Sequence, residues 1–183
     1  MQILTFDGKD EGLKHQMARL LVDAFREHWA DAWETFEDGL AEVEEMCEAE
    51  RICLVAAGDG KLLGMIGGIP EYDGKVWELH PLAVLPAFHG RGIGRALVLD
   101  FEEQVRRRGG LTVMLGTDDQ DGMTSLSDVD LYEDLWGKIR AIRNLKRHPY
   151  EFYQKMGYII TGVVPDANGI GKPDILMSKR VGE

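Results

Sequence analysis

The sequence predicts a mixed α/β fold, in which a sheet of about seven strands carries helices on both faces. Two observations predict it: strand-like segments first follow one another across tight turns, and then alternate with helix-like segments. A third is the length of 183 residues without repeats or Ser/Pro-rich linkers, which predicts one domain over residues 1–183. The hydrophobic content of 44% is ordinary for a globular protein and excludes a chain that is disordered throughout.

The first half of the chain predicts a strand, two helices and a hairpin. Apolar residues recur at helical spacing over residues 13–25, and again at Phe36, Leu40, Val43 and Cys47. The second helix falls within residues 27–50, which hold ten acidic side chains and no Lys or Arg. The expected elements are a strand at 1–6, these two helices, and strands at 52–57 and 62–69 joined by a turn at 58–60.

The second half predicts strands that alternate with helices. Pro81 interrupts a buried strand expected at 76–84, and because proline cannot donate to a sheet ladder, we expect a local break or bulge there. Gly109-Gly110 ends a helix expected at 92–108. The remaining expected elements are a strand at 111–115, an acidic loop at 118–134, a helix at 131–145, a short helix between Pro149 and Gly157, and strands at 158–164 and 174–179.

The acidic charge balance excludes some classes of partner. Lys and Arg number 21 and Asp and Glu number 32, which gives a net charge of −11. That charge disfavours nucleic acid and anionic membrane surfaces, both of which are bound through Lys and Arg. It suits a small cationic ligand, although a negative surface also serves solubility alone.

The cysteines and the N-terminus indicate a cytoplasmic protein without a metal site. Cys47 and Cys53 form no Cys-x-x-Cys pair, and no histidine cluster has metal-ligand spacing, so reduced thiols are expected. The first residues lack the pattern of a signal peptide, and no apolar run reaches the length of a membrane span.

A glycine-rich turn is the strongest local motif. His89-Gly90-Arg91-Gly92-Ile93-Gly94-Arg95 follows a strand and opens a helix, where unpaired N–H groups and the helix dipole favour a pyrophosphate. A simple strand-to-helix turn is the alternative. No Walker loop is present, and the order of elements disfavours a dinucleotide-binding fold.

The turn resembles the coenzyme A pyrophosphate loop of the GNAT acetyltransferase superfamily, which usually reads Gln/Arg-x-x-Gly-x-Gly/Ala. Gly92 and Gly94 match that pattern, whereas His89 stands at its first position. Residues 150–158 resemble the superfamily's late helix, and the element order agrees from Met1 to Lys179. The resemblance implies a twisted, mainly antiparallel sheet, splayed between its fourth and fifth strands. It also implies acetyl-coenzyme A as cofactor, held by Leu82, Val84, His89, Gly90, Arg91, Gly92, Ile93, Gly94, Arg95 and Tyr153.

Four further blocks resemble the chromosomally encoded aminoglycoside 6′-N-acetyltransferases. They are Trp77-Glu78-Leu79-His80-Pro81-Leu82, Leu115-Gly116-Thr117-Asp118-Asp119, His148-Pro149-Tyr150-Glu151-Phe152-Tyr153 and Asn168-Gly169-x-x-Lys172-Pro173-Asp174. The resemblance implies a cytoplasmic homodimer that transfers acetyl from acetyl-coenzyme A to the 6′-amine of aminoglycosides, by direct attack in a ternary complex. The alternatives are a related acetyltransferase for a polyamine, a peptide amine or a protein lysine, and a coenzyme A-binding module without activity.

The predicted catalytic residues follow from the needs of amine attack on a thioester. Glu78, His80 and Leu82 alternate on one face of a strand. Glu78 would orient the ammonium or accept its proton through water, with His80 ranked second as base, unless Glu78 pairs with a neighbouring Lys or Arg. The resemblance assigns the thioester carbonyl to the N–H of Leu82, and the proton for the leaving thiolate to Tyr153, whose alternative is a core aromatic.

Carboxylates are the expected ligands for a substrate with several ammonium groups. Asp118, Asp119 and Asp121 directly follow the predicted strand at 111–115, and we expect them to bind the substrate by charge and hydrogen bonds. We interpret the acidic side chains of residues 27–50 as a solvated face.

Overall fold

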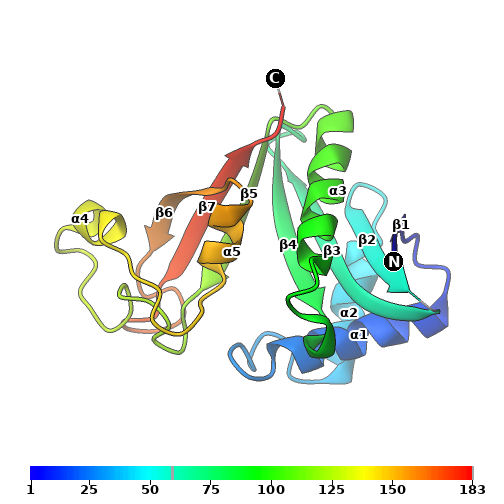
Figure 1. Cartoon of the computed structure of the whole chain (residues 1–183), viewed down its shortest axis with the longest axis horizontal. Helices are drawn as coiled ribbons and strands as arrows, with labels where there is room; N and C mark the ends of the chain where they lie inside the picture. Colours follow the sequence, from blue (N-terminus) through cyan, green and yellow to red (C-terminus); the bar gives the residue numbers. More distant parts are fainter. Residues whose placement is uncertain (59, 183) are drawn as a thin grey trace. The chain divides into compact units, whose positions relative to one another are not determined.

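The computed structural model describes residues 1–58 and 60–182, which form seven strands in the order β1-β2-β3-β4-β5-β7-β6 (Figure 1). The strands are β1 (Gln2–Thr5), β2 (Ile52–Gly58), β3 (Lys61–Glu71), β4 (Val76–Val84), β5 (Thr112–Asp118), β6 (Ile159–Val164) and β7 (Asp174–Arg180). The pairs β1–β2, β2–β3, β3–β4 and β6–β7 are antiparallel, so the predicted mixed, mainly antiparallel sheet is confirmed. In the hairpin turn predicted at 58–60, Asp59 lies outside the described residues.

The chain packs as two compact units, one of Met1–Val113 with the residues from Val181 onward, and one of Met114–Arg180. The first unit holds α1 (Glu11–Phe25), α2 (Phe36–Met46), the 3-10 turn η1 (Pro86–Phe88) and α3 (Ile93–Arg107). The second holds α4 (Leu135–Arg140) and α5 (Tyr150–Lys155). The single domain over residues 1–183 and the splay between the fourth and fifth strands stay predictions.

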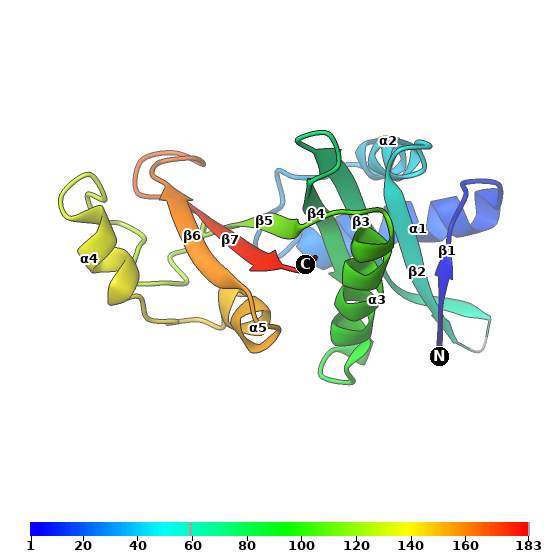
Figure 2. The same ribbon diagram turned by 90° about the horizontal axis from the view of Figure 1, so that it is seen from above.

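Helices cover both faces of the strands in the first unit, as predicted (Figure 2). A Cβ atom at Gly67 of β3 would lie 3.0 Å from Met46 of α2, whereas one at Gly68 would overlap the ring of Phe101 in α3. Successive strand residues point to opposite faces, so α2 and α3 lie on opposite sides of β3. Helix α1 packs against α2 and shares its core, in which Met17, Leu21, Val43 and Met46 are buried.

Side-chain caps set where α1 and α2 begin. The carboxylate of Asp10 accepts the N–H of Leu13 at 3.0 Å, which starts α1 two residues before the predicted boundary. A capping box starts α2, in which Thr35 accepts the N–H of Asp38 and Asp38 accepts that of Thr35. The predicted acidic helix is therefore confirmed, but it occupies only Phe36–Met46 of the acidic segment.

A bulge bends β4 at Pro81, as the sequence predicts. Ile66 pairs with Leu82 and Gly68 with Leu79, so that Gly67 alone faces both His80 and Pro81. A Cβ at Gly67 would overlap the carbonyl oxygen of His80, and glycine is therefore required for this close approach.

The second unit corrects one predicted helix. Instead of residues 131–145, α4 covers only Leu135–Arg140, because Asp134 caps it in a left-handed conformation with φ of 58°. Beyond α4 the chain turns back, and backbone hydrogen bonds join Ser125 to Arg143 at 3.0 Å and Leu145 to Met123 at 2.8 Å. These long-range bonds replace the helix that local periodicity favours.

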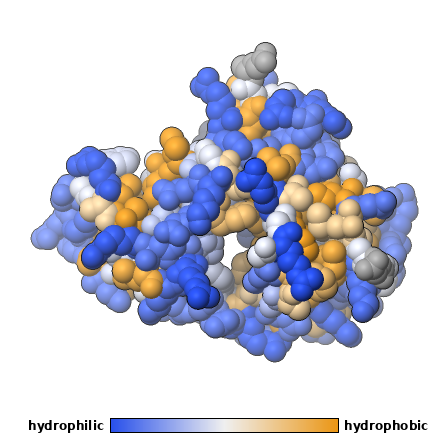
Figure 3. Space-filling model, in the orientation of Figure 1, coloured by the Kyte–Doolittle hydropathy of each residue, from blue (hydrophilic) through white to orange (hydrophobic). Residues whose placement is uncertain are grey.

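The surface seen in Figure 3 is largely hydrophilic, with smaller hydrophobic areas between the hydrophilic ones. No helix among the described residues has the length and apolarity needed to cross a membrane.

Candidate active site

Strand β4 carries three of the predicted catalytic residues at half-buried positions. Its burial alternates along the strand: Glu78, His80 and Leu82 are half-buried, whereas Trp77, Leu79, Pro81 and Ala83 are buried. Glu78 pairs with Ile69, and His80 lies 3.8 Å from Glu42, so these two side chains share the α2 side of the strand. The bulge at Gly67 shifts the alternation, and Leu82, which pairs with Ile66, lies on the α3 side. The predicted common face is therefore confirmed for Glu78 and His80 and wrong for Leu82.

The backbone of β4 leaves two N–H groups directed away from β3. Leu85 donates its N–H to the carbonyl of Leu63 at 2.9 Å, which makes these two a hydrogen-bonded pair of the antiparallel ladder. Since such pairs alternate, the pairs Gly64–Val84 and Ile66–Leu82 are non-hydrogen-bonded. The N–H groups of Leu82 and Val84 therefore point away from β3, to the edge of β4 that neighbours β5 in the strand order.

Glu78 is available as a carboxylate on the α2 side of β4. Within residues 1–58 and 60–182, the ion pairs of Lys and Arg are made with other carboxylates, and none includes Glu78. The alternative of a structural Glu78–Lys or Glu78–Arg pair thus has no counterpart in the described residues.

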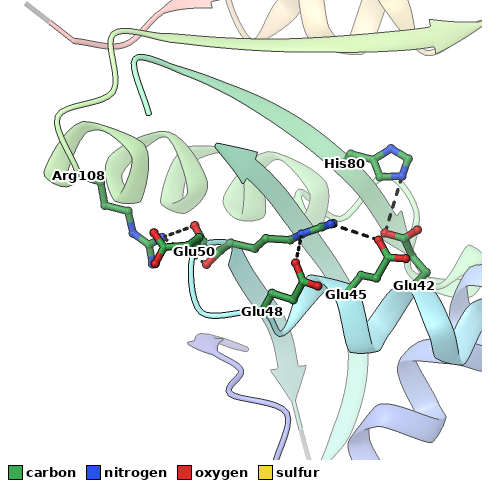
Figure 4. Close-up of polar contacts among 7 residues, drawn as sticks. Glu42, Glu45, Glu48, Glu50, His80 and Arg108 are labelled. Carbon is green, nitrogen blue, oxygen red and sulfur yellow. Dashed lines mark hydrogen bonds and ion pairs between the residues drawn. The ribbon is translucent and has the colours of Figure 1, made fainter. Parts of the chain in front are cut away.

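His80 interacts with a carboxylate that sequence reasoning assigned to a solvated face. Figure 4 shows Glu42 of α2 directed at His80, with 3.8 Å between Oε1 and Nε2. The ring of Trp33 lies 5.9 Å from that of His80. Burial lowers the pKa of His80, but the carboxylate of Glu42, and the charge of Glu78, raise it above the ordinary value. His80 is therefore more easily protonated than a free histidine.

The acidic segment before β2 forms an open surface pocket. About 500 Å³ in volume, it is lined by Asp31, Ala32, Trp33, Glu34, Asp38, Ala41, Glu42 and Glu45. Glu45 and Glu48 also pair with Arg51, at 3.2 and 3.1 Å. The interpretation of residues 27–50 as a solvated face is therefore incomplete, because helical spacing in a sequence does not show which strand a side chain such as Glu42 will meet.

The glycine-rich turn forms a cradle of the kind that a pyrophosphate requires. Gly92 caps α3 with φ of 79°, a left-handed conformation that glycine adopts readily, and a Cβ there would contact nothing within 4 Å. The first turn of α3, Ile93-Gly94-Arg95-Ala96, holds no acidic side chain. The guanidinium of Arg91 lies 5.0 Å over the ring of Phe88. Open space, exposed backbone donors and nearby arginines fit the phosphates of coenzyme A.

His89 makes an internal contact at the start of this turn. Its Nε2–H donates to the carbonyl of Val84 at 2.8 Å, which ties the turn to the end of β4. The carbonyl of Val84 accepts this bond on the side away from β3, in agreement with the alternation described above.

Tyr153 lies in the second unit, on α5. Its side chain is buried, with ring centroids of Phe152 and Tyr158 at 5.1 and 5.7 Å. Burial raises the pKa of Tyr153 well above that of free tyrosine, so the hydroxyl keeps its proton at neutral pH. Such a group serves as a hydrogen-bond donor, and less readily as a full proton donor.

The three aspartates after β5 differ in their surroundings. Asp119 is fully buried, and its two carboxylate oxygens accept the N–H groups of Met123 at 2.6 Å and Thr124 at 2.7 Å. Asp118 is half-buried and accepts the side-chain amide of Asn168, whereas Asp121 is exposed. Burial raises the pKa of Asp119, but its hydrogen bonds lower it by more, so the net change is a lowering. Both oxygens of this carboxylate are used by the loop that follows it.

The predicted site residues are thus divided between the units. Glu78, His80, Leu82, Val84 and the turn at 89–95 belong to the first, and Asp118, Asp119, Asp121 and Tyr153 to the second. Glu42 was not identified from the sequence. His148 was also given no role, although this residue begins the block at 148–153 that resembles aminoglycoside 6′-N-acetyltransferases.

Comparisons with known proteins relate the chain to acetyltransferases. Residues 15–135 match the model of the Acetyltransferase (GNAT) family. A search of curated proteins found no significant match. Among solved structures, an aminoglycoside 6′-N-acetyltransferase complexed with coenzyme A is 46% identical, with 99% of this chain and 97% of that chain covered and a TM-score of 0.91.

Two further structures support the same assignment. The aminoglycoside 6′-N-acetyltransferase from Enterococcus faecium is 45% identical, with 99% and 97% of the two chains covered and a TM-score of 0.89. Aminoglycoside 6′-acetyltransferase type Ii is 40% identical over the same shares, with a TM-score of 0.76. Because the family model matches residues 15–135, more than half of the chain, the chain belongs to the GNAT family of acetyltransferases.

Proposed function

We propose that this protein transfers the acetyl group of acetyl-coenzyme A to the 6′-amine of aminoglycosides, by direct attack in a ternary complex. The observation that carries the proposal is the likeness, at 40–46% identity over 99% of the chain, to three aminoglycoside 6′-acetyltransferases. The net charge of −11 also suits a substrate with several ammonium groups.

In the proposed mechanism, the first unit prepares the amine and binds the carbonyl. Acetyl-coenzyme A, when bound, supplies an activated thioester. Glu78 orients the ammonium group and accepts its proton through water, while the N–H of Leu82, which points away from β3, serves as donor to a carbonyl oxygen. Because Glu42 raises the pKa of His80, this imidazole more often carries a proton already, and Glu78 is therefore the proposed base.

The second unit contributes a donor and carboxylates to the proposed mechanism. The hydroxyl of Tyr153, which keeps its proton because burial raises its pKa, donates a hydrogen bond to the departing sulfur. Asp118 and Asp121 bind ammonium groups of the substrate, whereas Asp119 acts indirectly, by shaping the loop that carries them.

Substitution of Gly92 by valine is expected to weaken coenzyme A binding at least tenfold, or about 1.4 kcal/mol. The branched side chain would occupy the open space at the helix start, where the phosphates must approach. Isothermal titration calorimetry with coenzyme A measures the effect.

Gly109→Val is the matched control for this substitution. Gly109 has the same φ of 79° and equally open surroundings, but it follows the other end of α3. The control should carry a similar backbone strain and bind coenzyme A normally. Equal affinities of the two variants for coenzyme A would contradict the assignment of the pyrophosphate to the turn at 89–95.

We also infer a cytoplasmic homodimer, as the sequence resemblance implies. Cys47 and Cys53 are both free thiols, as is usual in a reducing compartment. Light scattering coupled to size-exclusion chromatography tests the assembly, with twice the mass of 20.5 kDa expected.

An amine panel tests the proposed substrate class. Release of coenzyme A thiol is measured with kanamycin-like aminoglycosides, polyamines, peptides with a free α-amine and lysine peptides. Only aminoglycosides with a free 6′-amine should support efficient turnover, and their KM should rise with salt, since screening is strong beyond about 8 Å at physiological ionic strength. Turnover of a polyamine or a peptide alone would move the assignment to another acetyltransferase of the family.

A further inference from the structure

His148 is a buried histidine that the mechanism above does not use. It belongs to the second unit, directly before Pro149 and α5, and only 2% of its surface is exposed. Both ring nitrogens are in hydrogen bonds. Nε2 lies 3.1 Å from the carbonyl oxygen of Asp118, and Nδ1 lies 3.2 Å from the backbone nitrogen of Tyr150.

The two partners determine the protonation of the ring. The backbone N–H of Tyr150 can only donate, so Nδ1 of His148 must accept and carries no proton. The carbonyl of Asp118 can only accept, so Nε2 carries the proton and donates. The network therefore requires a neutral imidazole with its proton on Nε2.

The backbone of His148 is held just as firmly as its ring. The side-chain oxygen of Asn144 accepts the N–H of His148 at 2.7 Å, and the side-chain nitrogen of Asn144 donates to the carbonyl of His148 at 2.9 Å. The ring also lies 5.7 Å from that of Tyr150. Hydrogen bonds to both ring nitrogens and both backbone groups of a buried histidine favour a single arrangement of the segments that they join.

The segments that His148 joins are both part of the proposed chemistry. Asp118 ends β5 and begins the acidic loop, and Tyr150 is the first residue of α5, one turn before Tyr153. We propose that His148 is a positioning residue, which as a neutral imidazole holds the carbonyl of Asp118 with Nε2 and the first N–H of α5 with Nδ1. One bond thereby fixes Asp118, the carboxylate proposed to bind the substrate, and the other fixes α5, the helix that carries Tyr153. This assignment of effects rests on the proposed function.

The neighbouring charges and burial have opposite effects on the pKa of His148. Burial lowers the pKa of His148, and it outweighs the carbonyl of Asp118 and the carboxylates of Asp118 and Asp119, which favour protonation. The folded protein therefore holds the neutral form below the pH at which an unfolded histidine takes up a proton, about 6.5. As the pH falls below that value, His148 is protonated in the unfolded chain while it stays neutral in the folded protein. The unfolded chain is thereby favoured, so the contribution of His148 to stability declines.

Nuclear magnetic resonance of the wild-type protein tests the bonding directly, without a variant or a substrate. Long-range ¹H–¹⁵N spectra of protein labelled in its histidines should show His148 at pH 7 as the neutral tautomer with its proton on Nε2. Its titration should fall below the ordinary histidine range. A proton on Nδ1, or an imidazolium at pH 7, would overturn the proposal.

Two substitutions separate the two bonds of the ring. His148→Asn places an oxygen near the position of Nδ1, so it keeps the acceptor for α5 and loses the bond to Asp118. His148→Gln places an amide near the position of Nε2, so it keeps the donor to Asp118 and loses the acceptor for α5. The first should raise KM for the aminoglycoside, and the second should lower kcat, each at least about fivefold, the usual scale of one lost buried hydrogen bond.

The controls distinguish this proposal from the failure of the proposed function. His15→Asn, in the exposed part of α1, should change neither constant. Equal losses in KM and kcat for both His148 variants would reduce His148 to a general structural residue and contradict the proposal. If the wild-type protein acetylates no aminoglycoside, the proposed function fails, and the tautomer measured by magnetic resonance still decides whether His148 makes these two bonds.

Discussion

Substitution of Tyr153 by phenylalanine is expected to lower kcat by about 10²–10³-fold, the usual effect of losing one positioned hydrogen-bond donor, while the affinity for acetyl-coenzyme A stays near that of the wild type. The change removes only the hydroxyl and leaves the ring packed between Phe152 and Tyr158. Because burial raises the pKa of Tyr153, its hydroxyl remains protonated and stabilises the departing sulfur as a donor. Single-turnover rates are the appropriate measurement, since product release can limit kcat.

Tyr150→Phe is the matched control for this prediction. Tyr150 lies one turn earlier on α5 and is also buried, so its variant loses the same group from the same helix. Its single-turnover rate should stay near that of the wild type. A Tyr153→Phe rate within twofold of the wild type would show that the hydroxyl does not stabilise the departing sulfur and that Tyr153 is a core aromatic.

Glu78→Gln should be the second large effect, and it should act on the amine. The substitution keeps the shape of the side chain at its half-buried position in β4 and removes its charge. KM for the aminoglycoside should rise, because an ammonium ligand is lost. The acidic limb of the kcat/KM profile should flatten, because the group that takes the proton is gone; such catalysis is typically worth about 10²–10⁴-fold.

Glu71→Gln provides the comparison for Glu78→Gln. Glu71 ends β3 and pairs in register with Val76, the first residue of β4, so it tests the loss of a strand carboxylate outside the site. The profile of this variant should match that of the wild type. An unchanged acidic limb in Glu78→Gln would show that another group, or water alone, deprotonates the amine.

Local patterns in the sequence were sufficient to predict β4 and α3. The alternation of residues 76–84 and the missing N–H of Pro81 are properties of a few neighbouring residues, and the structure places the strand and its bulge there. Gly92 likewise marks the start of α3 because its left-handed conformation favours glycine on steric grounds alone. Such features need no knowledge of what packs against them.

Features that depend on distant partners were not predicted. The helix expected at 131–145 covers only Leu135–Arg140 in the structure. The residues after it form backbone hydrogen bonds with residues 123–125 instead of continuing the helix. Asp119 was expected to bind the substrate because it is a carboxylate directly after a strand. Its two oxygens instead accept hydrogen bonds from two backbone N–H groups of the following loop. The contact of Glu42 with His80 joins α2 to β4, and no spacing in the sequence indicates it.

The most direct test of the central claim compares neomycin with paromomycin, which differ only in a 6′-amine or a 6′-hydroxyl. Purified protein is incubated with acetyl-coenzyme A and each compound, and the products are analysed by mass spectrometry and nuclear magnetic resonance. We predict one added acetyl group on neomycin, located on the 6′-nitrogen, and no comparable acetylation of paromomycin. Equal acetylation of both compounds, or an acetyl group on any other nitrogen of neomycin, would contradict the assignment.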